Sequence, residues 1–151
     1  MIVSLLISLA LVTLCIFLHA GVLRRLGVIL HVAGSRMKHP LMLVLFALFG
    51  LHLLEVMLYA IAMQIMEDLS LGHVQGVTPN EPGMFYDFFY FSMASYTTLG
   101  IGDLVPHGPI RMVAVMESLT GLILIAWSAS FTYLAMERLW RESVTGSPDE
   151  T

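Results

Sequence analysis

The sequence predicts an all-α membrane protein with three transmembrane helices, a shorter re-entrant helix and an irregular loop that follows it. Hydrophobic residues make up 58% of the 151 residues and charged residues only 12%, whereas soluble domains carry about 25% charged residues. A chain this short cannot bury that much apolar surface in a core of its own. Three segments are also apolar over about 20 residues, the length that crosses a bilayer. We therefore expect lipid or partner subunits to cover much of the surface.

The apolar runs divide the chain into spans and connecting segments. The first run has no charge before Arg24 and lacks both the basic start and the cleavage site of a signal peptide, which favours an uncleaved helix. The segment after it is apolar enough for a short interfacial helix, although a plain connector fits equally well. The polar C-terminal end is typical of a disordered tail. The predicted order is a first span (1–23), a loop (24–39), a second span (40–66), a third span (110–138) and a tail (143–151).

Basic residues predict the orientation of the spans. Six of the seven Lys and Arg residues lie in the 24–39 loop or after the third span, and only Arg111 lies on the other side. By the positive-inside rule, the loop and the C-terminal tail are cytoplasmic. The N-terminus and residues 67–109 are then outside, and the protein is expected in the cell membrane as a multi-pass protein.

Composition also excludes some classes of function. The net charge is −4 and no basic face is present, which argues against a nucleic-acid partner. Cys15 is the only cysteine, so an internal disulfide and a cysteine-rich metal cluster are excluded, and a buried, inert thiol is expected. The membrane carboxylates Glu55 and Glu117 lie on different spans without a paired catalytic motif, so we do not expect an enzyme.

Residues 84–103 carry the most specific pattern. Residues 84–96 are aromatic and apolar, which suits a short re-entrant helix, and Asp87 lies near its start, where a carboxylate favours a helix. Residues 97–103 read Thr-Thr-Leu-Gly-Ile-Gly-Asp, and glycines at alternate positions permit positive φ values. Such a strip can turn successive carbonyl oxygens towards one axis. At membrane depth it is tolerated only where it is buried in protein or lines a water-filled path.

Residues 97–103 resemble the potassium-channel signature Thr-Thr-Val-Gly-Tyr-Gly-Asp and are identical to it at five of seven positions. The resemblance extends over about residues 84–138. It implies a pore domain at 40–142 and a homotetramer in the lipid bilayer, with K⁺ as the permeant ion and no organic cofactor. The extra first span is similar to that of small bacterial channel proteins, which implies the bacterial inner membrane. The implied function is passive, potassium-selective conduction of dehydrated cations through a carbonyl-lined filter at the fourfold axis. A non-selective monovalent cation channel is the alternative.

The resemblance also implies roles for single residues. The Thr98 hydroxyl and the carbonyls of Thr98, Leu99, Gly100 and Ile101 would coordinate K⁺, Gly102 would shape the outer mouth, and Thr97 and Asp103 would support the filter. Two departures bear on this support. Ile101 replaces a tyrosine whose hydroxyl braces the filter, which leaves the degree of selectivity open. Ala94 stands where some relatives carry a glutamate, so Asp103 needs another partner, for which a backbone amide, Tyr90 and water are candidates.

The two carboxylates in the spans, Glu55 and Glu117, need partners, because a carboxylate in hydrocarbon costs about 2.5–3.5 kcal/mol. We hypothesise that Glu117 lies behind the filter and accepts hydrogen bonds from Ser92, Ser95 or Tyr96; the alternative is a protonated Glu117 in an inter-helix contact. His52 and Glu55 share one helix face and can pair with each other or with the first span. A pH or metal sensor is a less favoured interpretation of that pair, and His19 is interpreted as a packing histidine.

The third span is predicted to contain the cavity and the gate. Gly121 is either a hinge or a site of close helix packing. Thr120 is expected under the filter. Further along, a helical spacing predicts that the conduit is lined by Leu124, Ser128, Phe131 and Ala135. Phe131 and Leu134 are candidates for a closing apolar ring, whereas Trp127 is interpreted as a packing residue.

Overall fold

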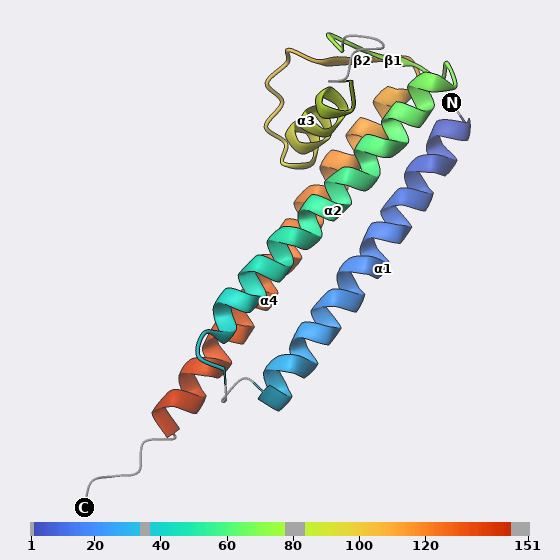
Figure 1. Ribbon diagram of the computed structural model, residues 1–151. Coiled ribbons are helices and arrows are strands. Elements are labelled where there is room, and N and C mark those ends of the chain that lie inside the picture. The colour runs from blue at the N-terminus through green and yellow to red at the C-terminus, as the bar shows by residue number, and fades with distance from the viewer. Residues whose placement is uncertain (1, 34–36, 78–83, 146–151) are drawn as a thin grey trace, which may run out of the picture.

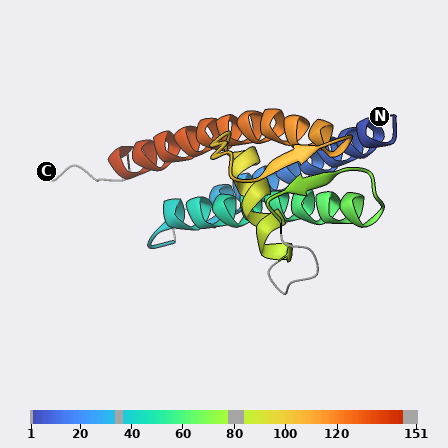
Figure 2. The same cartoon turned by 90° about the horizontal axis from the view of Figure 1, so that it is seen from above.

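The computed structural model describes residues 2–33, 37–77 and 84–145. Its elements follow in the order α1 (Ile2–Ala33), α2 (Pro40–Asp68), β1 (His73–Gln75), α3 (Met84–Tyr96), β2 (Val105–His107) and α4 (Ile110–Thr145). The helices α1, α2 and α4 run side by side as an elongated bundle, and α3 lies beside one end of it (Figure 1). Seen from above, α3 runs across α2 and α4 (Figure 2).

The three long helices confirm the predicted helical membrane fold. Each contains a stretch long and apolar enough to cross a bilayer, at Ile2–Val32, Pro40–Asp68 and Ile110–Arg141. Pro40 occupies the first turn of α2, where its missing N–H costs nothing. The helix α3 spans 13 residues, which agrees with the predicted re-entrant helix, and Asp87 lies in its first turn.

The first helix is longer than the sequence predicts. The prediction ended it at residue 23 and left 24–39 as a connector or a separate interfacial helix, but α1 continues without a break to Ala33. Arg24 and Arg25 mark the edge of the apolar run, yet arginine does not end a helix. The continuation is stabilised by packing, because leucines on α1 contact apolar residues of α2 and α4. This lower cluster contains Leu23, Leu26, Leu30, Val44, Leu48, Leu51 and Ala135.

The last helix also extends past its predicted end. The prediction stopped at residue 138, with a disordered tail from 143, whereas α4 reaches Thr145. Arg141 and Glu137 form an ion pair of 2.5 Å one turn apart, which supports this final stretch. The rest of the predicted tail, 146–151, lies outside the described residues.

A two-stranded ribbon was not predicted. The strands β1 and β2 pair antiparallel, with His73 opposite His107 and Gln75 opposite Val105. Gly72 makes the turn into β1 at a φ of 128°, and a Cβ there would lie 2.6 Å from the His107 carbonyl oxygen. Glycine is therefore required for the close approach that holds the ribbon across the top of α4.

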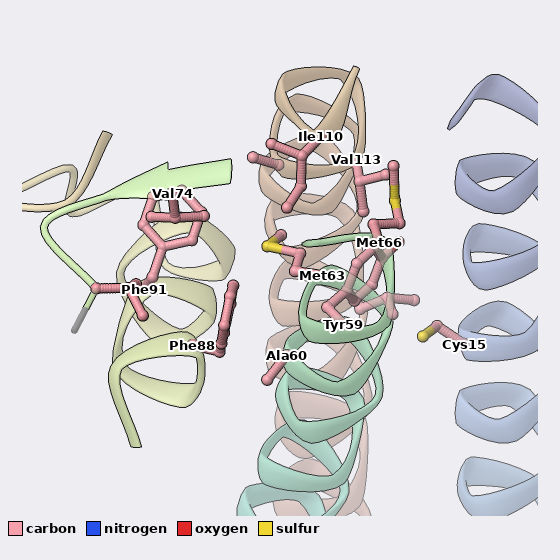
Figure 3. Packing of buried hydrophobic residues seen from close by; sticks show 13 residues of the cluster. Cys15, Tyr59, Ala60, Met63, Met66, Val74, Phe88, Phe91, Ile110 and Val113 are labelled. Carbon is pink, nitrogen blue, oxygen red and sulfur yellow. The ribbon is translucent and has the colours of Figure 1, made fainter. Parts of the chain in front are cut away.

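The upper core joins all four helices. Tyr59 and Met63 of α2, Phe88 of α3 and Ile110 of α4 are fully buried there, and Figure 3 shows their side chains between the helices. Cys15 is the contribution of α1 to this cluster and is fully buried, as expected for an inert thiol. This core fixes where α3 ends, and with it the position of residues 97–103.

Candidate functional site

The loop 97–103 begins as a direct continuation of α3. The amides of Thr97, Thr98 and Leu99 donate to the carbonyls of Met93, Ser95 and Ala94, at 3.1, 3.0 and 2.8 Å. The strip is thereby attached to the C-terminal end of α3, where the helix dipole is negative. That end favours a cation in front of it.

The backbone of the strip alternates in handedness. Thr98, Gly100 and Gly102 have φ values of 59°, 56° and 88°. The two glycines agree with the sequence pattern, but a positive φ is unusual for a β-branched residue such as threonine. Left-handed residues at alternate positions rotate successive peptide planes, so carbonyl oxygens can line one side of the strip.

Residues 97–103 are all exposed within a single chain. The side chains of Leu99 and Ile101 are 66% and 57% exposed. An added Cβ on Gly100 or Gly102 would meet nothing within 4 Å. Backbone conformation, rather than packing inside the chain, is what requires glycine at these two positions.

Asp103 is held at the end of the strip by two hydrogen bonds. Tyr90 donates its hydroxyl to Oδ2 at 3.1 Å, and the Leu104 amide donates to Oδ1 at 3.0 Å. Both kinds of partner were among those anticipated. Partial burial of Tyr90 and its hydrogen bond to Asp103 raise the pKa of the phenol, so it remains a donor at neutral pH.

Glu117 lies behind α3 and contacts Ser92, one of the partners predicted for it. The Ser92 hydroxyl hydrogen-bonds with Glu117 Oε1 and also lies 2.7 Å from the Val56 carbonyl oxygen. The second carboxylate oxygen of Glu117 has no hydrogen-bond partner among the described residues. Glu117 thus ties α4 to α3 and to α2 through one serine.

Gly121 is a packing glycine. A Cβ at this position would lie 2.1 Å from the Tyr96 carbonyl oxygen and 2.9 Å from the Tyr96 ring. Of the two interpretations, the structure favours close helix packing over a hinge, because the last residue of α3 occupies the space in front of Gly121.

The Tyr96 side chain reaches a polar cluster in the middle of the bundle. Its hydroxyl donates to Glu55 Oε2 at 2.5 Å and lies 2.8 Å from His52 Nδ1. Tyr96 was a candidate partner of Glu117, but it bonds with Glu55 instead. His19, interpreted as a packing histidine, is also part of this cluster, since its Nδ1 lies 3.0 Å from Glu55 Oε1. Pairing of Glu55 with the first span was one of the predicted possibilities, but His19, 36 positions earlier, was not singled out as the partner.

Leu134, a candidate for the closing ring, is 62% exposed, but the residues predicted to line the cavity lie mostly inside the subunit. The exposed fractions of Thr120, Leu124 and Ser128 are 4%, 0% and 7%. Thr120 accepts a hydrogen bond from Tyr59 of α2 at 3.3 Å. Phe131 packs against the lower cluster, to which Ala135 belongs. The predicted spacing marks a real helix face, but α1 and α2 cover it, so these residues cannot line a central conduit.

A different face of α4 borders the strip. An open groove of about 520 Å³ lies between the strip and α4, and its lining includes Gly100, Gly102, Arg111, Val115 and Ser118. One and two turns further, Leu122 and Ile125 are 58% and 40% exposed. This apolar face continues the groove along the helix.

Comparisons with known proteins identify a family. A family model described as an ion channel matches residues 41–138. The inward rectifier potassium channel Kirbac3.1 of Paramagnetospirillum magnetotacticum is 36% identical over 90 residues, which are 59% of this chain and 28% of that protein. The matched part therefore spans less than a third of the relative. The comparison with solved structures found no significant match.

Proposed function

Because this chain belongs to the ion channel family whose model matches residues 41–138, we propose that it is a passive, potassium-selective channel. It is a multi-pass membrane protein with three apolar helices. The observation that carries the proposal is the strip 97–103, with left-handed residues at alternate positions and full exposure among the described residues of its own chain. The relative with 36% identity is named as a potassium channel, which favours K⁺ as the permeant ion.

In this proposal the strip is a selectivity filter. The Thr98 hydroxyl and the carbonyls of Thr98, Leu99, Gly100 and Ile101 replace the hydration shell of K⁺. Gly102 shapes the outer mouth. The negative end of α3 points towards the dehydrated ion and offsets part of its desolvation cost. No organic cofactor and no enzymatic step are needed for conduction of this kind.

A ring of such strips requires several copies of the chain. One strip cannot surround an ion, and four related by a closed symmetry axis complete the carbonyl rings. We therefore propose a homotetramer in the lipid bilayer. The exposure of Leu99 and Ile101 in one chain, together with the open groove beside the strip, is consistent with cover from neighbouring subunits.

Filter support comes from groups that replace the absent tyrosine hydroxyl. Thr97 extends α3 into the strip, and its hydroxyl bonds with the Met93 carbonyl oxygen at 2.8 Å. Asp103 is held by Tyr90, and Glu117 holds α3 from behind through Ser92. The conduit below the filter follows the exposed face that begins at Val115 and Ser118, with Leu122 and Ile125 as its first apolar ring.

The proposed location is the bacterial inner membrane, with the N-terminus outside and the C-terminus in the cytoplasm. The basic residues support this orientation. The C-terminal part of α1 lies at the same end of the bundle as the C-terminal part of α4 (Figure 1). The first carries Arg24 and Arg25 and the second Arg138 and Arg141.

Ion flux into proteoliposomes tests the function. We expect uptake of Rb⁺ or K⁺ but not Na⁺, and loss of uptake in Gly100→Ala, because alanine at a φ of 56° is strained. Gly50→Ala is the matched control, since Gly50 is helical and an added Cβ meets nothing within 4 Å. Equal Na⁺ and K⁺ flux would instead establish a non-selective channel and implicate Ile101. Absence of flux from every variant, with the oligomer intact, would contradict an open channel.

A further inference from the structure

We propose that His19, His52 and Glu55 form a binding site for a divalent transition-metal ion, such as Zn²⁺, buried between α1 and α2. The three side chains come from two helices that run side by side (Figure 1). Their ligand atoms, one from each residue, all lie within 4.8 Å of one another. This site lies outside the filter, and its existence does not depend on ion permeation.

The distances suit a metal centre. His19 Nδ1 lies 3.0 Å from Glu55 Oε1, and His52 Nδ1 lies 3.2 Å from Glu55 Oε2. Zinc bonds of about 2.0–2.2 Å in a tetrahedral site put neighbouring ligand atoms roughly 3.3 Å apart. Both imidazoles thus already approach the carboxylate at nearly the separation that a shared ion requires.

The orientation of the imidazole rings is the strongest argument. Ser128 Oγ lies 3.0 Å from His52 Nε2 and 3.1 Å from His19 Nε2. One hydroxyl oxygen has two lone pairs and can accept from both Nε2–H groups. In that tautomer both Nδ1 lone pairs face the Glu55 carboxylate, and a cation between them would bind all three groups. An outer hydrogen-bond partner on the second ring nitrogen is also the usual support of metal-bound histidines.

Tyr96 supplies a fourth position. Its hydroxyl is 2.5 Å from Glu55 Oε2 and 2.8 Å from His52 Nδ1, so it faces the same point as the three ligands. Two imidazole nitrogens with carboxylate and phenol oxygens form a set that suits Zn²⁺, Co²⁺, Fe²⁺ or Ni²⁺. Ca²⁺ and Mg²⁺ prefer oxygen ligands alone and are not expected to bind there.

The burial of Glu55 means that its ionised carboxylate needs a positive partner. His19 and Glu55 are fully buried within predicted spans. An ionised carboxylate at this depth needs a positive partner. A bound metal supplies that charge; the competing explanation is a protonated imidazole that forms an ion pair with Glu55 and leaves no vacant ligand position.

Metal binding to the purified full chain, prepared without a polyhistidine tag and stripped with a chelator, distinguishes the two explanations. The probes are Zn²⁺ by calorimetry and Co²⁺ by its visible absorption. We expect one ion per chain and Zn–ligand distances of about 2.0–2.1 Å with a histidine pattern in X-ray absorption. We expect loss of binding in His19→Ala and His52→Ala. Ser128→Ala should bind roughly 10–100-fold more weakly, because it removes the outer partner of both rings.

The control removes the other close histidine pair. The rings of His73 and His107 stack 5.0 Å apart on the ribbon, so the double variant His73→Ala, His107→Ala should bind the probe like the wild type. Circular dichroism and oligomer size identify any variant that has not folded, and His52→Asn is the milder substitute. Absence of Zn²⁺ and Co²⁺ binding by the folded wild type, or binding that is lost only in the ribbon variant, would overturn the proposal.

Discussion

The carbonyl oxygen of Tyr96 lies 2.1 Å from the point where a Cβ of residue 121 would stand. Tyr96 is the last residue of α3, and the strip 97–103 begins with the next residue. The absence of a side chain on Gly121 therefore sets how closely α4 approaches the start of the strip.

Gly121→Ala should abolish or strongly reduce ion flux. The methyl group would displace the end of α3, and overpacking of this kind costs about 1–3 kcal/mol. We expect a lower Tm in detergent and at least about tenfold less Rb⁺ uptake. Gly21→Ala is the control, because an added Cβ on that helical glycine meets nothing within 4 Å. Wild-type uptake by Gly121→Ala would show that the close contact is dispensable.

Tyr90→Phe should weaken discrimination between K⁺ and Na⁺. The variant removes the hydroxyl that donates to Asp103 and leaves the ring in place. A hydrogen bond to a charged group contributes about 1.5–3 kcal/mol, which is enough to lower the K⁺/Na⁺ flux ratio about tenfold or more. Tyr86→Phe, on a side chain that is 70% exposed, should leave the ratio unchanged. Equal ratios in both variants would mean that Asp103 is held by its backbone contact alone.

Ser92→Ala should destabilise the subunit. It leaves the Val56 carbonyl oxygen and Glu117 Oε1 without their shared partner in a buried position. An unsatisfied buried polar group costs about 1–3 kcal/mol, so we expect a lower Tm in detergent. Ser130→Ala is the comparison, because that exposed hydroxyl bonds only back to its own helix at Ala126. If Ser92→Ala lowers the Tm no more than Ser130→Ala does, the Ser92–Glu117 contact makes no measurable contribution to stability.

Tyr96→Phe and Glu55→Gln should show coupled effects on stability. Tyr96→Phe removes the 2.5 Å bond between α3 and α2, and Glu55→Gln weakens the same bond by removing the charge of its acceptor. The double variant should therefore lose less stability than the two single losses combined. Interaction energies of about 0.5–3 kcal/mol are typical of residues in one network. Tyr133→Phe is the control, because Tyr133 is 61% exposed. Its effect on stability should simply add to that of Glu55→Gln. Strict additivity of Tyr96→Phe with Glu55→Gln would contradict a shared bond.

The parts that the sequence predicts well carry local signals. The helix 84–96 and the glycines of the strip are encoded by composition and conformational preference over a few residues, and both agree with the structure. The Ser92–Glu117 contact was predictable because both residues are polar in otherwise apolar helices. The ribbon escaped prediction because each of its strands has only three residues, too few for an alternating pattern.

The parts that were wrong depend on tertiary packing. Helix α4 is apolar over most of its circumference, so periodicity alone could not decide which face packs on α1 and α2. Thr120, Leu124 and Ser128 were assigned to a conduit for this reason, although they are buried inside the subunit. The interpretation of His19 as a satisfied packing histidine agrees with its full burial, but its partner Glu55 was not identified, because the register of α1 against α2 cannot be read from either helix alone.

The polar cluster links the first helix, α1, to α2 and α4 through His19. The ion channel model matches only residues 41–138, so α1 lies outside the shared module. Yet His19 of α1 hydrogen-bonds with both Glu55 of α2 and Ser128 of α4. A variant that begins at residue 40 would lose this partner of the buried Glu55, and a carboxylate left without partners in hydrocarbon costs about 2.5–3.5 kcal/mol. We therefore expect chimeras that receive residues 41–138 of this chain to be more stable when α1 of this chain is transferred with them.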